Sequence, residues 1–347
     1  MKKFLIYLVA AVVILGGLLR FSLEFEGMQD TAIDEMARAA MKRNAEGLPN
    51  PDALRVFMCG TASPLGVGRA QACVAILTPT HFYLVDVGAG AGAEIQRANL
   101  PLERLQGVFL THFHSDHIAE LYEVNLGSWV RGRPEPMRVF GPRGVKSVID
   151  GINDTYELDR GYRIEHHGED LLPGHLGKLV HQTIDEDLVL EDGDLKVTAY
   201  IAEHDPASPA LGYRFDYRGR SVVISGDSNV IDETRRVSDG ADLLLHDALS
   251  VPLVTTMAKA AKQAGAERLS KIATDVLDYH ASVQSIVALN DEIDIGMVGY
   301  YHLVPIPVTI VQQKFFERNL PENYVVTDDG DWFELPSNSD EIKHIRP

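Results

Sequence analysis

THFHSDH, residues Thr111 to His117, is the most informative segment of this chain. This short segment contains three histidines and one aspartate, at positions 112, 114, 116 and 117. Both residue types are costly to bury without partners, so core packing does not explain why they are crowded together. Imidazole and carboxylate groups are common ligands of divalent metals. The segment therefore predicts a metal site.

The spacing within the segment predicts two ions. His112 and His114 follow the apolar run GVFLT, and residues two apart in an extended chain point to the same side. Both imidazoles can therefore bind one ion. Asp116 and His117 stand at the expected start of a helix, where a turn directs them to a second point close by. One segment thus offers two ligands to each of two metals.

Further candidate ligands close apolar runs elsewhere in the chain. His204 ends VTAYIAEH, Asp227 ends SVVISGD and His302 ends IGMVGYYH. The last residue of each run would emerge at the edge of a sheet, where functional residues collect. A carboxylate has two acceptor oxygens, so Asp227 can bridge two cations. Taken singly, each residue also fits an ordinary loop, turn or core position; together with the histidine-rich segment they complete two ligand sets.

Two series of short apolar runs indicate the fold class. Runs from LRVFMC (54–59) to GVFLTH (107–112) and from LKVTAYIAEH (195–204) to IGMVGYYH (295–302) read as strands, with helical patterns between and after them. Two successive sets of strands with helices predict an α/β fold in which two stacked sheets carry outer helical layers.

The histidine-rich segment resembles the HxHxDH signature of the metallo-β-lactamase superfamily. Four other segments resemble later or neighbouring motifs of that family, in the same order: YLVDVGAG (83–90), EHDPASPALGYRF (203–215), ISGDS (224–228) and GYYHLVP (299–305). The resemblance covers residues 54–335 and implies a four-layer αββα sandwich with a two-metal site. It assigns one metal to His112, His114 and His204, and the other to Asp116, His117 and His302, with Asp227 bridging and Asp86 supporting the ligands.

Within the superfamily, the chain is similar to the ribonuclease Z and arylsulfatase-like branch through CGTASPLGVGR (59–69) and LLLHDA (243–248). The second segment implies that His246 donates a proton and that Asp247 is its neighbour. His280, in YHAS, resembles a further histidine of the branch that supports the site. Ile224 departs from the branch, because ribonuclease Z has a glutamate at this position, and no Gly-Pro-rich arm for gripping transfer RNA is evident.

The charge of the chain bears on its partners. It contains 32 Lys and Arg against 50 Asp and Glu, a net charge of −18. This balance argues against nucleic acid, which is bound by a basic face. The sequence predicts a small anionic or ester substrate instead, with positive charge supplied by the metals. A homo-oligomer is left open.

Residues 1–21 differ from the rest of the chain. Lys2 and Lys3 precede an uncharged apolar run from Phe4 to Leu19, 16 residues long. We expect an uncleaved anchor in the inner membrane, with the catalytic domain on the periplasmic side, or alternatively a cleaved signal segment and a periplasmic protein. Residues 22–50 are expected to form a connecting helix and linker, and residues 51–347 the catalytic domain.

The chain has two cysteines, Cys59 and Cys73. In an exported protein they can form one disulfide, and two buried thiols are the alternative.

These features favour a metal-dependent hydrolase of phosphate or sulfate esters. Two divalent ions, zinc by preference with manganese or iron also suited to these ligands, would activate a shared hydroxide. Asp116 would orient the hydroxide and accept its proton, and His246 would protonate the leaving oxygen. Hydrolysis of a lactone or β-lactam is an alternative. A membrane-tethered binding module that keeps the fold without turnover is a second alternative, from outside the enzymes.

Overall fold

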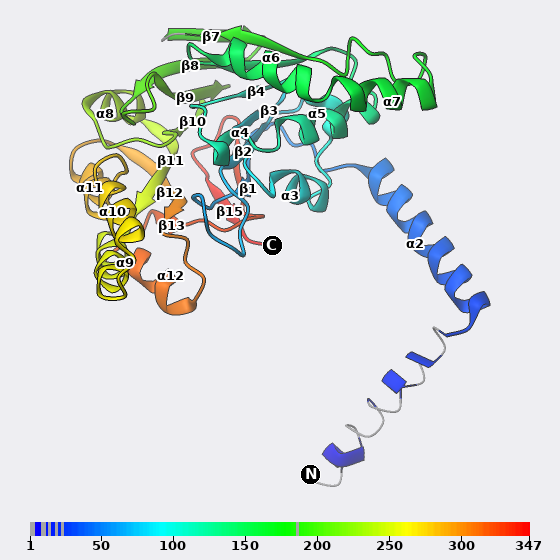
Figure 1. Cartoon of the computed structure of the whole chain (residues 1–347), viewed down its shortest axis with the longest axis horizontal. Helices are drawn as coiled ribbons and strands as arrows, with labels where there is room; N and C mark the ends of the chain where they lie inside the picture. The colour runs from blue at the N-terminus through cyan, green and yellow to red at the C-terminus, as the bar shows by residue number, and fades with distance from the viewer. Residues whose placement is uncertain (1–3, 8–11, 13–14, 18–19, 22–23, 185–186) are drawn as a thin grey trace. The chain divides into compact units, whose positions relative to one another are not determined.

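The computed structural model describes residues 4–7, 12, 15–17, 20–21, 24–184 and 187–347 (Figure 1). The chain divides into two compact units, Met1–Pro49 and Asn50–Pro347. In the first unit, the connecting helix expected within residues 22–50 is observed as α2 (Glu26–Glu46), which ends at Gly47 with a positive φ of 63°. A glycine at this position suits the end of a helix, since it adopts positive φ without strain.

The expected membrane anchor is corrected by the structure. No helix within the described part of the chain is both long enough and apolar enough to cross a bilayer. Residues 1–3, 8–11, 13, 14, 18 and 19 of the predicted anchor lie outside the described residues. A run of 16 residues makes about 24 Å of helix, short of the roughly 30 Å of a hydrocarbon core. The inner-membrane and periplasmic location, which was inferred from this run, loses its support.

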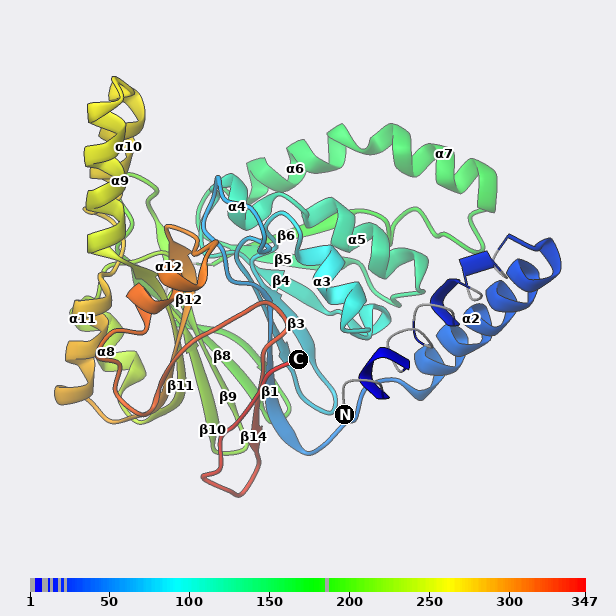
Figure 2. The ribbon, with the colours of Figure 1, turned by 90° about the horizontal axis from the view of Figure 1, so that it is seen from below.

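The second unit is built on two sheets (Figures 1 and 2). The first sheet has the strand order β15-β14-β1-β2-β3-β4-β5-β6. Its strands are β1 (Ala53–Gly60), β2 (Cys73–Leu77), β3 (Phe82–Val85), β4 (Gly107–Phe109), β5 (Met137–Gly141), β6 (Leu179–Thr183), β14 (Trp332–Pro336) and β15 (Lys343–Ile345).

The second sheet has the order β13-β12-β11-β10-β9-β8-β7. Its strands are β7 (Asp187–Asp192), β8 (Leu195–Ala202), β9 (Ala210–Tyr217), β10 (Arg220–Ile224), β11 (Ala241–Leu249), β12 (Ile295–Val304) and β13 (Tyr324–Val326). In both sheets a block of neighbouring strands is parallel: β3 to β6 in the first, and β10 to β13 in the second.

Helices and short 3-10 turns connect the strands. They are α3 (Ala91–Arg97), η1 (Leu102–Arg104), α4 (Ser115–Ile118), α5 (Leu121–Val130), α6 (Val145–Thr155), α7 (Glu157–His167), α8 (Asp232–Ser238), α9 (Val251–Gln263), α10 (Glu267–Asp275), α11 (Val283–Ala288), η2 (Leu289–Asp291) and α12 (Ile310–Phe316). Helices α3 and α6 contact the first sheet, whereas α8 and α11 contact the second.

The main core lies between the two sheets. Phe109 at the end of β4 stacks on Phe140 of β5, with ring centroids 4.5 Å apart, and meets Tyr213 and Phe215 of β9 edge-on or tilted. Strands β2, β3 and β10 are buried along their whole length, which explains why they read as continuous apolar runs. The predicted arrangement of two stacked sheets with outer helices is confirmed. A hydrophobic helix that precedes the sheets in the chain is not confirmed.

The loop between β1 and β2 is fixed at both ends. Cys59 and Cys73 form a disulfide, which decides between the two alternatives left open by the sequence. The Asp329 carboxylate accepts hydrogen bonds from the backbone N–H groups of Thr61 and Ala70. Ala62 pairs with Leu303, the residue after His302, so this loop borders the predicted metal site.

Candidate metal centre

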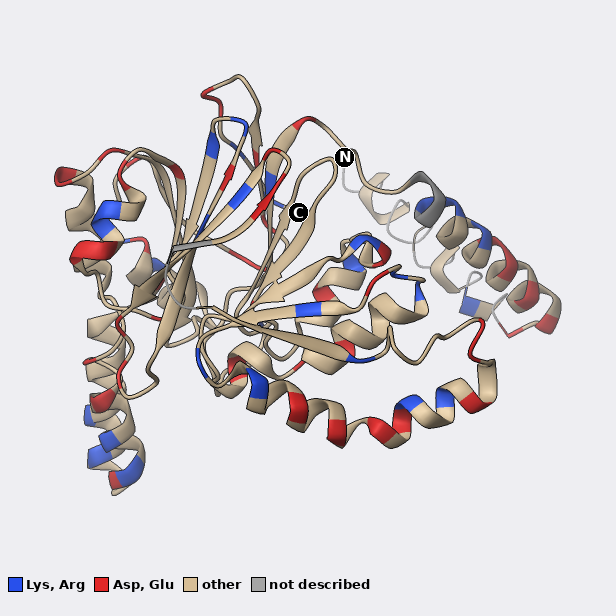
Figure 3. Cartoon of the chain, turned by 90° about the horizontal axis from the view of Figure 1, so that it is seen from above, with Lys and Arg blue, Asp and Glu red and all other residues tan. Residues whose placement is uncertain are grey.

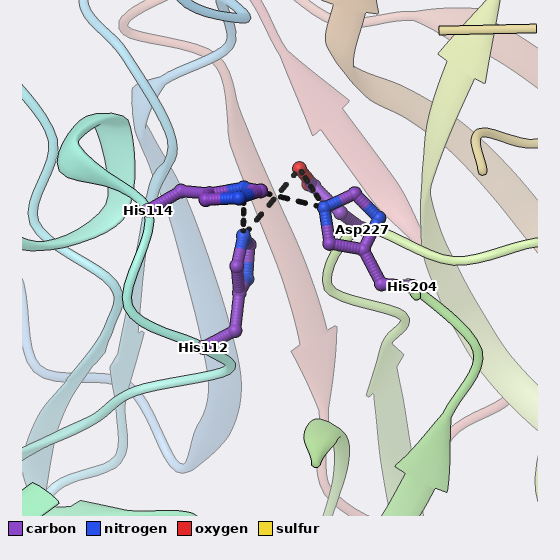
Figure 4. Close-up of side chains that lie close together, drawn as sticks. All are labelled: His112, His114, His204 and Asp227. Carbon is purple, nitrogen blue, oxygen red and sulfur yellow. Dashed lines mark hydrogen bonds and ion pairs between the residues drawn. The ribbon is translucent and has the colours of Figure 1, made fainter. Parts of the chain in front are cut away.

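The first predicted ligand set comes together at the ends of three strands (Figure 4). His112 and His114 follow β4, His204 follows β8, and Asp227 follows β10. One ligand atom from each of these four residues lies within 4.8 Å of the other three. Asp227 Oδ2 lies 3.7 Å from His204 Nε2 and 3.9 Å from His112 Nε2. His114 is the exposed member of the group, so it marks the side that faces solvent.

The second predicted set adjoins the first and shares Asp227 with it. Asp116 and His117 lie on α4, and His302 lies on β12. Their ligand atoms and that of Asp227 lie within 4.8 Å of one another, and all four residues are buried. Asp227 Oδ2 is 3.3 Å from His117 Nε2, and Asp227 Oδ1 is 3.3 Å from His302 Nδ1. The geometry therefore suits a bridging role for this carboxylate.

The donor set fits divalent cations. Among the described residues, His117 Nε2, Asp227 Oδ1 and His302 Nδ1 are buried atoms that make no hydrogen bond. Buried polar atoms without hydrogen bonds are rare and need an explanation. Here all three point into the space between the ligand atoms, and a metal ion would satisfy them. Imidazole nitrogens with carboxylate oxygens are a set that zinc accepts, as do manganese and iron.

The electrostatics of the two groups differ. Burial alone would raise the pKa of the Asp227 carboxyl, but the charges of His302 and His117 outweigh it and hold that pKa well below its usual range. Conversely, burial lowers the pKa of His117, yet Asp227 and Asp86 raise it well above the ordinary value. Without metal, protons on imidazoles thus balance the carboxylates. Metal cations that displace these protons would bind neutral imidazoles and ionised carboxylates, which are the forms that ligate metals.

His112 behaves in the opposite way. Burial, followed by the neighbouring His117, lowers the pKa of His112 well below its ordinary value. Burial also lowers the pKa of His204. Both residues are therefore neutral at physiological pH, which is the form that binds a metal.

Asp86 orients His117 of the second ligand group from the side opposite the metal site. It follows β3, has a φ of 56°, and accepts hydrogen bonds from Thr111 N–H at 2.9 Å and Thr111 Oγ1 at 2.8 Å. Its Oδ2 also lies 2.8 Å from His117 Nδ1. Because Nδ1 is engaged with Asp86, the Nε2 atom of His117 faces the metal site.

Gly88 allows the Asp86 loop to approach the histidine-rich segment. A Cβ atom at position 88 would lie 2.1 Å from the carbonyl oxygen of Asp116, a distance that no side chain tolerates. The N–H of Val87 donates to the carbonyl of His117 at 2.8 Å in the same approach. The glycine is thus required for the close contact that brings Asp86 to His117.

Tyr279 is a site residue that the sequence analysis missed. Its carbonyl oxygen lies 3.0 Å from His204 Nδ1, and its ring lies 5.1 Å from the His204 ring. Engagement of Nδ1 directs His204 Nε2 to the first ligand group. Because the backbone carbonyl of Tyr279 makes this contact, the type of its side chain did not indicate the role. The position next to His280 was the one sign of it in the sequence.

The structure separates the two histidines near Asp247. His280 Nδ1 lies 2.9 Å from Asp247 Oδ2, and the His280 ring lies 5.2 Å from His204 and 5.4 Å from His302. His280 therefore borders the metal site. His246 is fully buried; its Nδ1 pairs with Asp247, and its Nε2 makes no hydrogen bond within the described residues. His246 is not among the described residues whose ligand atoms gather in the two groups, and its role as proton donor stays a prediction.

Comparison with known proteins agrees with this geometry. A family model described as "Beta-lactamase superfamily domain" matches residues 81–294. The ribonuclease Z of Mycobacterium bovis (strain BCG / Pasteur 1173P2) is 32% identical over 258 residues, covering 73% of this chain and 86% of that protein. The ribonuclease Z of Mycobacterium marinum is 30% identical over 256 residues, covering 73% and 87%.

Solved structures share the fold at lower identity. The metallo-β-lactamase fold protein YhfI of Bacillus subtilis has a TM-score of 0.60 and 16% identity, covering 82% of this chain and 99% of that one. The short form of human tRNase Z has a TM-score of 0.56 and 19% identity, covering 81% and 99%. The chain therefore belongs to the metallo-β-lactamase superfamily, in its ribonuclease Z branch. It is a hydrolase of that fold, with His and Asp groups that can bind divalent metals.

The relatives correct one further expectation. The net charge of −18 argued against nucleic acid and for a small ester substrate. Relatives named ribonuclease Z overturn this argument, since their name specifies RNA. The physical reason is that net charge sums the whole surface, whereas a nucleic acid meets only one part of it.

Proposed function

We propose that this protein is a hydrolase of phosphodiester bonds that works with two divalent metal ions, zinc by preference. The observation that carries the proposal is the convergence of seven side chains in two groups that share Asp227. One ion would be held by His112, His114, His204 and Asp227, and the other by Asp116, His117, Asp227 and His302. A pair of such ions lowers the pKa of water to near neutrality and stabilises charge on the oxygens around phosphorus.

The residues of the chain supply positioning and proton transfer. Asp116 contacts His302 Nε2 at 3.0 Å through Oδ2, and this contact would hold its carboxylate in place to orient a water at the ions. Burial raises the pKa of Asp116, but hydrogen bonds with His117 and His302 outweigh burial and lower it. The carboxylate is therefore ionised at neutral pH, in the form that orients water and receives its proton.

His280 takes the role of proton donor to the leaving oxygen in this proposal, in place of His246. Asp247 engages His280 Nδ1, so the opposite ring nitrogen is directed away from Asp247, where the rings of His204 and His302 lie. Asp247 is itself held by the N–H of Ser228 and by Ser225, whose Oγ accepts from the Asp247 N–H. A positioned acid of this kind contributes roughly 10²–10⁴-fold to the rate.

RNA is the substrate class that we propose, on the strength of the relatives named ribonuclease Z. The test combines metal analysis of the full chain with a panel of substrates: a transfer-RNA precursor, bis(p-nitrophenyl) phosphate, p-nitrophenyl sulfate, a lactone and a β-lactam. We expect two ions per chain, with cleavage of the RNA and of the phosphodiester. Turnover of the sulfate, lactone or β-lactam without phosphodiester turnover would overturn the proposal, as would a chain that binds no metal.

A further inference from the structure

The helices α9 and α10 form a hairpin that extends away from the sheets. In Figure 2 this hairpin stands out from the end of the molecule that carries α4, the helix with Asp116 and His117. The two helices pack against each other along their length and are joined by a turn at Gly265, whose φ is 74°. The hairpin therefore reaches beyond the metal centre on the side where the ligands lie.

The base of the hairpin is held by the same strands that carry the site. Ser250, before α9, donates its N–H to the carbonyl of Val304, two residues after His302. Beyond α10, the chain runs into Tyr279, whose carbonyl engages His204. Leu249, Val254 and Val304 form a buried cluster under the hairpin. The hairpin is thus fixed in position relative to the metal ligands.

The far end of the hairpin is cationic, in contrast to the chain as a whole. Residues 259–271 contain one carboxylate, Glu267, and four cationic side chains, all of them exposed: Lys259, Lys262, Arg268 and Lys271. Figure 3 shows these basic residues gathered at the tip. Within the described residues, Lys271 pairs with Asp275 and the other three cations make no ion pair. Such a concentration of cations in a chain of net charge −18 favours contact with a polyanion.

We propose that this far end of the α9–α10 hairpin binds the phosphate backbone of the RNA that is cleaved at the metal centre, an inference that rests on the proposed function. Lys259 is eight residues beyond the first residue of α9, or about 12 Å along the helix axis. A small phosphodiester bound at the metals does not reach so far. A polynucleotide carries phosphates along its whole length and can occupy both places.

A protein partner is the competing occupant. Met257, Leu269 and Ile272 expose 50%, 61% and 45% of their surface on the hairpin. Charge decides in favour of RNA, because three exposed cations without acidic partners are costly to cover with a protein that does not neutralise them. The experiment below separates the two occupants.

The test neutralises all four cations at once: Lys259→Gln, Lys262→Gln, Arg268→Gln and Lys271→Gln. The matched control neutralises four exposed cations elsewhere: Arg131→Gln, Lys146→Gln, Lys178→Gln and Lys196→Gln. Lys146 pairs with Asp150 four residues on, as Lys271 does with Asp275, so the control removes one such pair as well. The RNA is a transfer-RNA transcript that has first been incubated with the enzyme until cleavage stops. Its affinity for each variant is then measured at several salt concentrations. Hydrolysis of bis(p-nitrophenyl) phosphate is measured in parallel.

We expect the hairpin variant to bind RNA at least ~10-fold more weakly near 0.1 M salt, and its salt slope to fall by about 2–4, since each phosphate contact contributes roughly 0.7–0.9 to that slope. The control should change affinity less than ~2-fold, and phosphodiester turnover should be unchanged in both. Equal losses in the two variants would overturn the inference. Intact RNA binding in the hairpin variant would also overturn the inference. A changed oligomeric state in a second variant, Leu269→Ser with Ile272→Ser, would then identify a protein as the occupant. Absence of phosphodiester turnover in the unaltered protein, with the difference in RNA affinity between the two variants still present, would count against the proposed function and not against RNA binding by the hairpin.

Discussion

Asp247 Oδ2 and His280 Nδ1 lie 2.9 Å apart, although 33 residues and the whole α9–α10 hairpin separate them in the chain. Both residues are buried, and the His280 ring borders two of the predicted metal ligands. A carboxylate that engages one ring nitrogen fixes the orientation of the imidazole and the side to which its other nitrogen points. This pair is the proton donor of the proposed reaction.

His280→Ala should lower kcat roughly 10²–10⁴-fold on a phosphodiester with a poor leaving group, such as RNA, because the departing oxygen then lacks a proton donor. Turnover of bis(p-nitrophenyl) phosphate should change far less, since p-nitrophenolate leaves without one. Asp247→Asn should show the same pattern more weakly. His246→Ala is the comparison: a leaving-group dependence for His246 and none for His280 would return the role to His246.

Asp227→Asn should reduce bound metal below two ions per chain and reduce phosphodiester turnover to near background, because Asp227 is the residue common to both ligand groups. His114→Ala should lower the occupancy of one ion only, and the exposed position of His114 means that the fold should persist. Metal analysis and circular dichroism of both variants check these outcomes. Two ions retained in Asp227→Asn would exclude a bridging role.

Asp86→Asn should weaken metal binding about 10–100-fold while leaving every direct ligand in place, because outer partners of metal-bound histidines have effects of that size. Asp86 accepts from Thr111 and engages His117 Nδ1, and an amide can satisfy only part of this set. Competition with a chelator measures the affinity. Unchanged affinity would mean that Asp86 serves only the turn after β3.

The pH dependence of His117 can be isolated in metal-free protein. Although burial lowers its pKa, Asp227 and Asp86 raise it above the ordinary value, so protonation of His117 stabilises the folded state. A raised folded-state pKa gives a contribution that is complete below the unfolded pKa of about 6.5 and disappears as pH rises through the folded pKa. His117→Gln should therefore destabilise the chelator-treated protein more at pH 6 than at pH 9, as measured by urea unfolding. A larger effect at pH 9 would contradict the assignment.

Reduction of the Cys59–Cys73 disulfide should destabilise the protein by about 3 kcal/mol, the chain-entropy value for a loop of this length, given the separation of 14 residues. Thermal unfolding with and without a reductant measures the effect. The Cys59→Ala/Cys73→Ala variant should unfold at the lower temperature in both conditions. A reductant that lowers the unfolding temperature of that variant as well would point to another cause.

Much of the site followed from sequence because most of the ligands lie at or near strand ends, with Asp116 and His117 on the helix that follows β4. Period-two spacing placed His112 and His114 together, and short apolar runs ended at His204, Asp227 and His302. The sequence indicated Asp247 and His280 as supporting residues, but not that they pair with each other. His246 and Asp247 are adjacent on β11 and contact each other, and only tertiary packing brings His280 to Asp247. Tyr279 acts through its backbone, which leaves no mark on residue type.

The N-terminal run and the net charge misled for a common reason. Each was read as an average: apolar character over Phe4 to Leu19, and charge over the whole chain. Spanning a bilayer depends on the length of a continuous helix, and binding RNA depends on the charge of one surface. Neither average contains that information.

Of the seven proposed ligands, four follow β4 in the first sheet and three belong to the second. Neither half of the chain therefore contains a complete coordination sphere. Substitutions that shift one sheet against the other would therefore separate the two parts of the ligand set. The centre thus adds a chemical requirement to the core that already joins the two sheets.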